Sequence, residues 1–274
     1  MPDLASDRLF FYNKTILEEA GVTEPPATWA DLEAAAEKIL ASQPDVIPLA
    51  LPLGPEEAQA EFIIWAGSNG GTVFKDGEWT LDSPENIEAM EFVKGLVEKG
   101  YTQPSPGTTN RTDGAFPLFA QGKAAMMNGA IFFPGELEKA GSTVDWGVTP
   151  IPANEGKDSI TLGVQDYFFA FKKDGNQVPV QKFLDFLFVP ENYAKFLEAA
   201  GGFLPATVSA GAKADPALKP FVDALPSAIF YPSDQKAWPA TQGALQQQIG
   251  TAVQSGGDPA AVLGAIQAEA EAAS

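Results

Sequence analysis

The stretch FFYNKTILEEAGVTEPPATWADL, residues 10–32, contains the elements that decide the fold. The residues RLFFYN (8–13) are rich in aromatic and β-favouring side chains and predict a buried strand that runs into a short helix ending at Gly21. Thr28 and Asp31 have the spacing of a capping box, which predicts a second helix to about Leu40. A strand followed closely by helices favours an α/β architecture.

The same alternation continues along the chain, with no internal repeat. Asp76 and Gly77 predict a small hairpin, and Ser83 with Pro84 predicts the start of a helix. Apolar residues at helical spacing predict the core face of that helix. Further strands are expected at 44–54, 123–129, 145–152 and 166–171, and further helices at 56–71, 115–121, 178–188, 191–200, 216–224, 237–254 and 259–272.

The composition excludes several kinds of chemistry but says less about the fold. The chain has 274 residues, 45% of them apolar, and no cysteine or histidine. Thiol nucleophiles, imidazole bases and zinc sites built on these residues are therefore excluded, and we expect no metal and no cofactor. Seventeen basic against 36 acidic residues give a net charge of −19, so nucleic acid is not an expected partner.

The sequence shows no pattern typical of a signal peptide or of a membrane-spanning helix. The longest apolar runs, such as FIIWA at 62–66, are far shorter than the roughly 20 residues that cross a bilayer. No basic stretch followed by an apolar run is visible near Met1, so no signal peptide is expected in these residues.

Five segments in a fixed order carry a resemblance to a known family. They are FFYNKTILEEAG with PPATWADL, SNGGTVFKDGEWTLDSPENIEAMEFVKGLVEKGY, FAQGKAAMMNG, VDWGVTPIPA and GGFLPA. In this order they resemble the C-terminal two thirds of the family 1 extracellular solute-binding proteins, the maltose-binding-protein-like lipoproteins of ABC transporters. The resemblance implies a non-enzymatic, extracytoplasmic protein that captures a sugar or oligosaccharide for a membrane permease.

The implied fold is a type II periplasmic-binding-protein architecture, with two α/β lobes joined by hinge crossings. Residues 1–9, 144–149 and 201–210 would be the crossings. Residues 10–143 and 211–274 would form the C-terminal lobe, and 150–200 the remainder of the N-terminal lobe. The family's opening segment has no counterpart here, so we expect an incomplete N-terminal lobe that exposes Phe168, Phe183, Leu187 and Phe196 and promotes instability or association.

Sugar sites combine aromatic rings with carboxylates, amides and arginines. On the family's pattern the first crossing contributes Ser6, Asp7 and Arg8, for which a hinge salt bridge is the alternative. Glu61 and Trp65 begin a helix that faces the cleft in relatives, although Trp65 fits a core position equally well.

The other candidates follow strands or precede a long helix. Asn128 ends the strand at 123–129, after which relatives carry a stacking tryptophan. Phe132 and Phe133 stand there instead, and this departure puts the identity of the sugar in doubt. The remaining candidates are Gln165, Asp166 and Tyr167 after a glycine and valine, and Trp238, with Tyr231 and Asp234 close to it in sequence.

Three alternatives stay open. Two carboxylates can hydrolyse a glycoside without histidine, but Glu56 with Glu57 lies at a helix start where the dipole and solubility explain it. The same fold could take a polyamine, an amino acid derivative or an anion. The chain could also be an interaction module without a small ligand.

Overall fold

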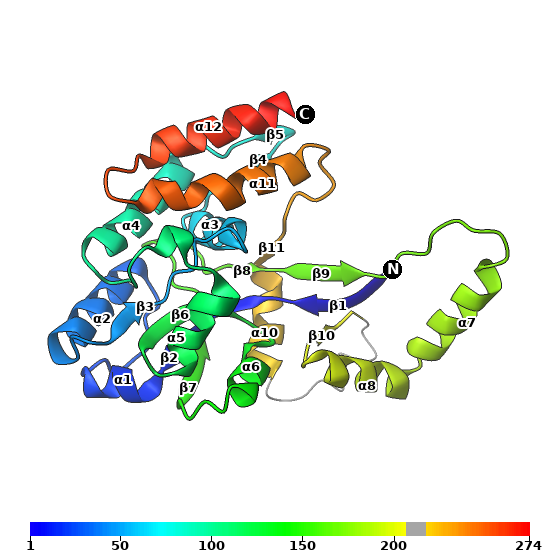
Figure 1. The fold of residues 1–274 in the computed structure, drawn as a ribbon, viewed down its shortest axis with the longest axis horizontal. Coiled ribbons are helices and arrows are strands. Elements are labelled where there is room, and N and C mark those ends of the chain that lie inside the picture. Colours follow the sequence, from blue (N-terminus) through cyan, green and yellow to red (C-terminus); the bar gives the residue numbers. More distant parts are fainter. Residues whose placement is uncertain (207–217) are drawn as a thin grey trace.

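The computed structural model describes residues 1–206 and 218–274, which form a large body and a smaller arm (Figure 1). The body contains a four-stranded sheet in the order β3-β6-β2-β7. The arm contains a three-stranded sheet in the order β10-β1-β9. Strand β1 (Pro2–Ser6) belongs to the arm and β2 (Arg8–Asn13) to the body, so one residue, Asp7, separates the two sheets.

The strand β2 is central to the body because it pairs on both sides. It runs antiparallel to β6 (Ala124–Ala130) and to β7 (Trp146–Thr149), while β3 (Ile47–Leu49) runs parallel to β6. Successive residues of a strand point to opposite faces, and Phe10 and Phe11 accordingly enter two different apolar clusters. The strand expected at 8–13 is confirmed.

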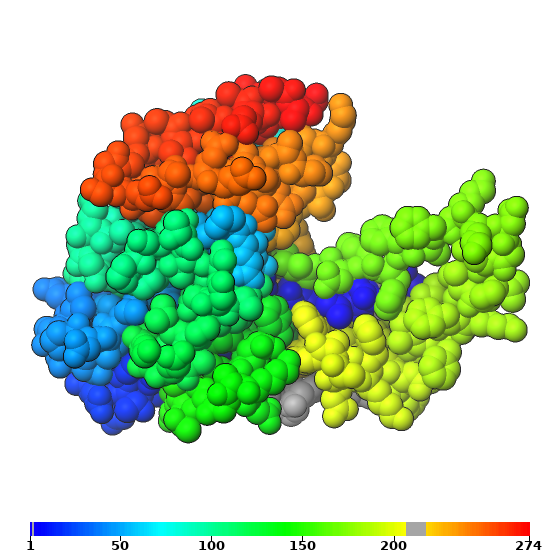
Figure 2. Space-filling model, viewed as in Figure 1, coloured from blue at the N-terminus to red at the C-terminus, as the bar shows by residue number. Residues whose placement is uncertain are grey.

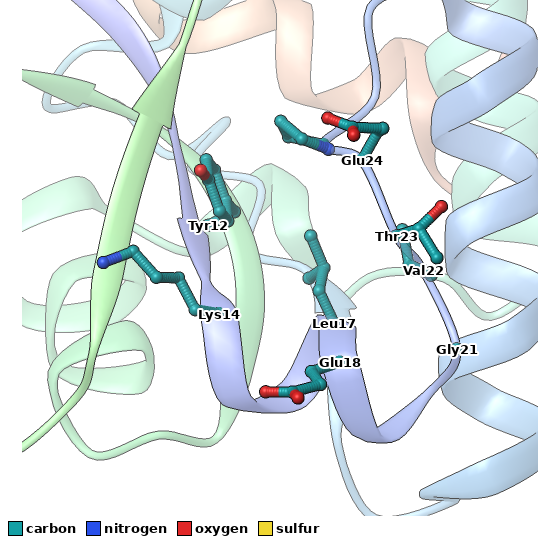
Figure 3. A pocket seen from close by; sticks show the side chains of 9 residues that line it. Tyr12, Lys14, Leu17, Glu18, Gly21, Val22, Thr23 and Glu24 are labelled. Carbon is teal, nitrogen blue, oxygen red and sulfur yellow. The ribbon is translucent and has the colours of Figure 1, made fainter.

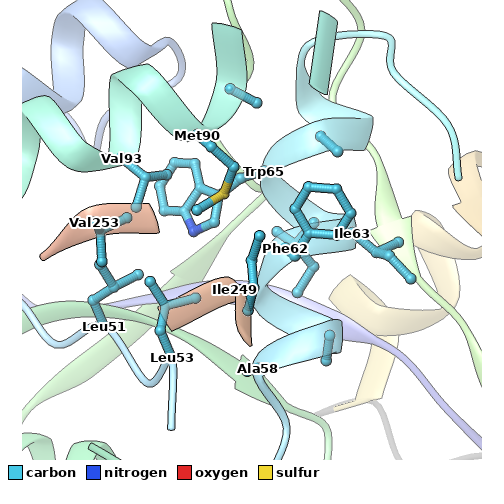
Figure 4. Packing of buried hydrophobic residues seen from close by; sticks show 14 of the residues in the cluster. Leu51, Leu53, Ala58, Phe62, Ile63, Trp65, Met90, Val93, Ile249 and Val253 are labelled. Atoms are coloured by element: carbon cyan, nitrogen blue, oxygen red, sulfur yellow. The ribbon is translucent and has the colours of Figure 1, made fainter. Parts of the chain in front are cut away.

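The larger cluster lies under a group of helices (Figure 4). Helix α3 (Ala58–Ser68) is buried along its whole length, with Trp65 packed near Met90 and Val93 of α4 (Pro84–Glu98). The other elements around it are α2 (Trp29–Ser42), α11 (Trp238–Gln248), η5 (Ile249–Val253) and α12 (Pro259–Ala272). The short hairpin of β4 (Phe74–Lys75) and β5 (Glu78–Trp79) turns at Asp76 and Gly77, as expected.

The second cluster is built on aromatic rings around Phe11. Phe133 lies 5.2 Å from Phe11 between ring centroids, and Phe119 lies 6.4 Å from it. The elements that contribute to this region are α5 (Phe116–Ala120), α6 (Phe133–Lys139) and α10 (Lys219–Ala224). Short elements complete the body: α1 (Lys14–Glu19), η1 (Pro106–Thr108), η2 (Arg111–Ala115), η4 (Leu225–Ser227), and the parallel pair β8 (Thr161–Leu162) and β11 (Ala228–Ile229).

The arm has little core of its own. Its sheet consists of β1, β9 (Val164–Tyr167) and β10 (Leu204–Pro205), and its helices are α7 (Gln177–Leu187) and α8 (Pro190–Ala200). Its buried apolar cluster consists of Leu4, Tyr193 and Leu197. The hydroxyl of Tyr193 donates to the Asp3 carbonyl and accepts from the Ala206 amide at 2.8 Å, which ties α8 to the sheet.

Two expectations about this region need correction, and part of a third lies outside the described residues. The strand expected over 166–171 is wrong beyond Tyr167, because the chain from Phe168 onward is irregular. Leu187 is buried and Phe168 and Phe196 are half-buried, whereas Phe183 is exposed as expected. Of the crossing expected at 201–210, residues 207–210 lie outside the described part of the chain.

The expected crossing at 144–149 forms β7 at the edge of the body sheet. The division of the chain into two lobes with these boundaries stays a prediction.

Candidate functional site

Polar side chains converge where the chain passes from the arm into the body. Ser6, Asp7 and Arg8 are buried at this junction. The Thr161 hydroxyl of β8 accepts from the Arg8 amide at 2.9 Å and donates to the Arg8 carbonyl at 2.6 Å. Strand β8 therefore holds the backbone of the crossing in place.

Glu61 and Asn128 meet beside this crossing, although they come from a helix and a strand. The Asn128 side-chain amide donates to the Glu61 carboxylate at 3.0 Å, and both groups are buried. The register of β2 on β6 places Asn128 opposite Phe10, two residues along from Arg8. Helix α3 and strand β6 thus direct two polar side chains towards the start of β2.

Burial changes the protonation of both acidic groups in this cluster. Desolvation raises the pKa of Asp7 to about 7, against a smaller opposing effect of the Arg8 charge. Desolvation also raises the pKa of Glu61 to about 7, partly offset by Asn128, Trp65 and Arg8. Burial therefore favours the protonated, neutral form of both groups far more than in a solvated carboxyl group.

Several buried oxygens of the cluster have no hydrogen-bond partner among the described residues. They are both carboxylate oxygens of Asp7 and the side-chain carbonyl oxygen of Asn128. A buried polar atom without a partner costs about 1–3 kcal/mol, so such atoms are rare in a finished core. Unpartnered oxygens of this kind can complete their hydrogen bonds with a bound molecule.

Further charged side chains lie next to the cluster. Glu57 lies 3.5 Å from Arg8 and also forms an ion pair with Arg111, which lies 3.8 Å from Glu56. Burial and the nearby charge of Arg8 lower the pKa of Arg111 to about 10. Glu56 and Glu57 lie at the start of α3 as expected, and Glu57, which makes no side-chain cap bond there, also pairs with both arginines.

Aromatic rings flank the charged groups. Arg111 lies over the ring of Phe132 at 5.5 Å, and Tyr231 stacks on Trp238 at 5.3 Å with 25° between the planes. Burial raises the pKa of Tyr231 against the opposing charge of Arg8, which places the phenol within the electrostatic reach of the cluster. Trp238, at the start of α11, is buried against this ring.

The structure separates the sequence candidates into three groups. Arg8, Glu61 and Asn128 lie together at the crossing, and Ser6 and Asp7 directly precede Arg8 in the chain. Trp238 is linked to them through Tyr231, and Phe132 through Arg111. Trp65 is completely buried between Trp29 and Phe92, and Phe133 is completely buried among phenylalanines, so neither offers a face to a solute here. Gln165, Asp166 and Tyr167 lie exposed on β9, where Gln165 is opposite Ala5.

Sequence reasoning missed Arg111, Glu57 as an ion-pair partner, and Thr161. Arg8 and Glu57 are 49 positions apart, and Arg8 and Thr161 are 153 positions apart, so no local spacing signals their contact. Asp234, near Tyr231 in sequence, is exposed.

A surface pocket lies elsewhere on the body. It has a volume of about 470 Å³ and is lined by Tyr12, Lys14, Glu18 and the loop 21–25 (Figure 3). Lys14 makes an exposed ion pair with Asp145 at 2.7 Å. None of the crossing residues borders this pocket. Figure 2 shows a broad hollow between the α11 side of the body and the arm, bordered by β9, with β1 next to β9 on the far side.

Comparison with known proteins decides the family. The model of the bacterial extracellular solute-binding proteins matches residues 2–194. The chain belongs to this family. It is thus a substrate-binding protein of the ABC transporter type, as the resemblance implied, from a family that acts outside the cytoplasm. No helix in the described ranges is long and apolar enough to cross a membrane.

Relatives and solved structures agree with this assignment. A Brucella abortus protein described only as a binding protein is 32% identical over 278 residues, covering 99% of this chain and 67% of the relative. The sn-glycerol-3-phosphate-binding periplasmic protein of Rhizobium meliloti is 29% identical over 228 residues, covering 76% of this chain and 49% of the relative. This solute-binding protein therefore spans part of the length of these relatives.

The fold likeness is closer than the sequence likeness. A sugar transporter structure from Arthrobacter chlorophenolicus with bound laminaribiose aligns with a TM-score of 0.85 at 24% identity, covering 99% of this chain and 71% of the other. Maltose-bound MalE3 of T. maritima aligns with a TM-score of 0.84 at 21% identity, with the same coverage. The expected type II periplasmic-binding-protein fold is confirmed.

Proposed function

We propose that this solute-binding protein takes a sugar or a polyol, bound at the crossing by Asp7, Arg8, Glu61 and Asn128. The observation that carries the proposal is the set of buried oxygens on Asp7 and Asn128 that have no partner among the residues the structure describes. A hydroxyl group both donates and accepts, so neighbouring hydroxyls can satisfy carboxylate oxygens and arginine donors together. Few other neutral solutes carry so many neighbouring groups that both donate and accept hydrogen bonds.

The flanking aromatic rings support the same class of solute. The C–H faces of a sugar pack on aromatic rings, and Trp238 with Tyr231 stands beside the charged cluster. The solved relatives named above were determined with laminaribiose and maltose, and another similar structure contains ribitol. Delivery of the solute to an ABC permease, after closure of two lobes around it, is part of the proposal.

A phosphorylated polyol is the second candidate. The proximity of Arg8 and Arg111 favours it, and the glycerol-3-phosphate-binding relative has that specificity in its name. Both arginines are already paired with Glu57, however, and the net charge of −19 opposes anion capture. A neutral polyhydroxylated solute therefore ranks first.

Isothermal titration calorimetry tests the proposal. Maltose, laminaribiose, ribitol, glycerol 3-phosphate and spermidine are titrated into the chain at pH 7. Binding of a neutral sugar or polyol is expected, and Asn128→Ala is expected to weaken it at least about tenfold because the amide's hydrogen bonds are lost. Asp145→Asn, which alters only an exposed ion pair, is the control and should leave the affinity unchanged.

Two results would contradict the proposal. If spermidine alone gave binding heat, the site would be specific for cations. If glycerol 3-phosphate alone gave binding heat, it would be specific for anions. Unaltered affinity in Asn128→Ala, with the fold preserved by circular dichroism, would move the site away from the crossing.

A further inference from the structure

Both arginines of this chain meet at one carboxylate in the body. Of the 17 basic residues of the sequence only two are arginines, Arg8 and Arg111, and they lie far apart along the chain. Nη2 of Arg8 lies 3.5 Å from Oε2 of Glu57, and Nη1 of Arg111 forms an ion pair with the same oxygen. The two guanidinium groups therefore share a single anionic atom.

The surroundings hold both guanidinium groups in place. The Arg111 guanidinium lies over the rings of Phe116 and Phe132, at 5.4 and 5.5 Å from the ring centroids. The Thr161 hydroxyl fixes the Arg8 backbone, and the side chains of Arg8 and Arg111 are only 6% and 15% exposed. Each guanidinium presents its N–H donors in a rigid fork that matches carboxylate and phosphate oxygens. The two arginines thus form a preorganised site for an anionic group.

The Glu57 carboxylate is directed to the arginines rather than to its own helix. Glu57 is the N-cap residue of α3, but its side chain makes no cap hydrogen bond there. The neighbouring Glu56 is held differently, because its carboxylate accepts from the Thr112 amide at 2.9 Å and from the Thr112 hydroxyl. Glu56 is therefore anchored to η2, with Arg111 at 3.8 Å, whereas Glu57 is the carboxylate that joins the two arginines.

The charge balance at this place depends on Glu57. Burial raises the pKa of Asp7 and of Glu61 to about 7, which favours the neutral forms of the two other acidic groups beside Arg8. A buried charge that loses its partner is strongly destabilising. Removal of the Glu57 charge would therefore leave two arginines that favour a replacement anion.

From these contacts we propose that Glu57 is a specificity-determining residue: its carboxylate occupies the two arginines as an internal anion and so excludes solutes that carry an anionic group. A protein can discriminate between ligands by blocking the competitor as well as by binding the preferred one. A neutral polyhydroxylated solute need not displace Glu57, because Nε of Arg111 is a buried donor without a partner in the described ranges and a hydroxyl can accept from it. The inference rests on the proposed function for the solute that is admitted, whereas the exclusion of anions is measured separately.

Isothermal titration calorimetry of glycerol 3-phosphate into the full chain, at pH 7 and constant ionic strength, tests the inference. Glu57→Ala should bind this anion at least about tenfold more tightly than the unaltered chain, the effect of one charge-assisted hydrogen bond. Glu57→Gln keeps the shape of the side chain, and its amide oxygen can still accept from an arginine. This second variant preserves the packing at the arginines and should gain at least about threefold, since only the competing charge is lost.

The gain should require the arginines. Arg111→Met fills the space between the two phenylalanine rings with an uncharged, flexible side chain that packs well on aromatic groups. Added to Glu57→Ala, it should remove the acquired affinity for glycerol 3-phosphate.

Two matched variants separate the effect from a change in net charge. Glu136→Ala removes one negative charge at an exposed ion pair with Lys139. Glu56→Ala removes one negative charge next to Glu57 but leaves Glu57 on both arginines. Neither variant should acquire affinity for glycerol 3-phosphate.

An unchanged affinity for glycerol 3-phosphate in both Glu57 variants would overturn the proposal and leave Glu57 as a structural ion-pair partner. An equal gain in Glu56→Ala or Glu136→Ala, a gain that survives Arg111→Met, or equally tight binding by the unaltered chain would also overturn it. The proposed function is judged from neutral sugars and polyols on the unaltered chain. Failure of those titrations would contradict the proposed function, while the anion titrations would still decide the role of Glu57.

Discussion

The protonation of Asp7 should make the stability of this protein depend on pH in the opposite sense to an ordinary surface carboxylate. Burial raises the pKa of Asp7 to about 7 in the folded chain, whereas an unfolded aspartate titrates near 3.9. Between these values the folded state holds a proton that the unfolded state has released. The free energy of unfolding contributed by this group therefore falls as the pH rises from about 4 to above 7.

The magnitude follows from the two pKa values. Between pH 5 and pH 8 the linkage relation gives a loss of about 2.5 kcal/mol of stability from Asp7 alone. Asp7→Asn keeps a neutral side chain of nearly the same shape at every pH. The variant should thus be close to the unaltered chain at pH 5 and gain on it by about 2.5 kcal/mol at pH 8.

Urea unfolding, followed by tryptophan fluorescence at both pH values, measures this difference. Asp145→Asn, at an exposed ion pair, is the control and should follow the unaltered chain at both pH values within about 0.5 kcal/mol. Parallel stability curves for Asp7→Asn and the unaltered chain would refute the reasoning, because they would mean that the Asp7 carboxylate is hydrated or paired in the folded state.

Two further predictions concern the fold. Thr28→Ala removes a capping box in which both hydrogen bonds are present and should lower the free energy of unfolding in urea by about 1 kcal/mol. Ser83→Ala, at a helix start without a side-chain cap bond, should lower it by less than about 0.5 kcal/mol. Equal losses of stability in the two variants would contradict the capping argument. In Gly129→Ala the new Cβ would lie 2.4 Å from the ring of Phe11 and should lower the melting temperature, at a cost of about 1–3 kcal/mol. Gly95→Ala, where no atom lies within 4 Å of the new Cβ, should be neutral or gain up to about 1 kcal/mol, and a comparable loss at both glycines would count against the packing argument.

Much of the fold was predictable because its signals are local. The capping box at Thr28 and Asp31 joins residues three positions apart, and the helix opened by Asp258 begins at Pro259 as expected. The strand at 8–13 was legible from its aromatic and β-favouring residues. The strand expected over 166–171 ends at Tyr167; Phe168 still exchanges two backbone hydrogen bonds with Met1, and residues 169–171 belong to no strand.

The candidate site was only partly predictable. Asp7, Arg8 and Glu61 could be named because the resemblance to the solute-binding family indicated which crossing and which helix to examine. The burial of Trp65 could not be predicted from the sequence, because a helical tryptophan gives the same sequence pattern whether its ring faces a core or a cleft.

The sequence by itself determined the family, the alternation of strands and helices, and the absence of thiol and imidazole chemistry, since each depends on residue types and short spacings. Only the tertiary structure decided that Arg8 meets Glu57 across 49 positions, that Asn128 donates to Glu61, and that the oxygens of Asp7 find no partner in the described chain. These are contacts between distant segments, and they exist only after the sheets and helices have packed.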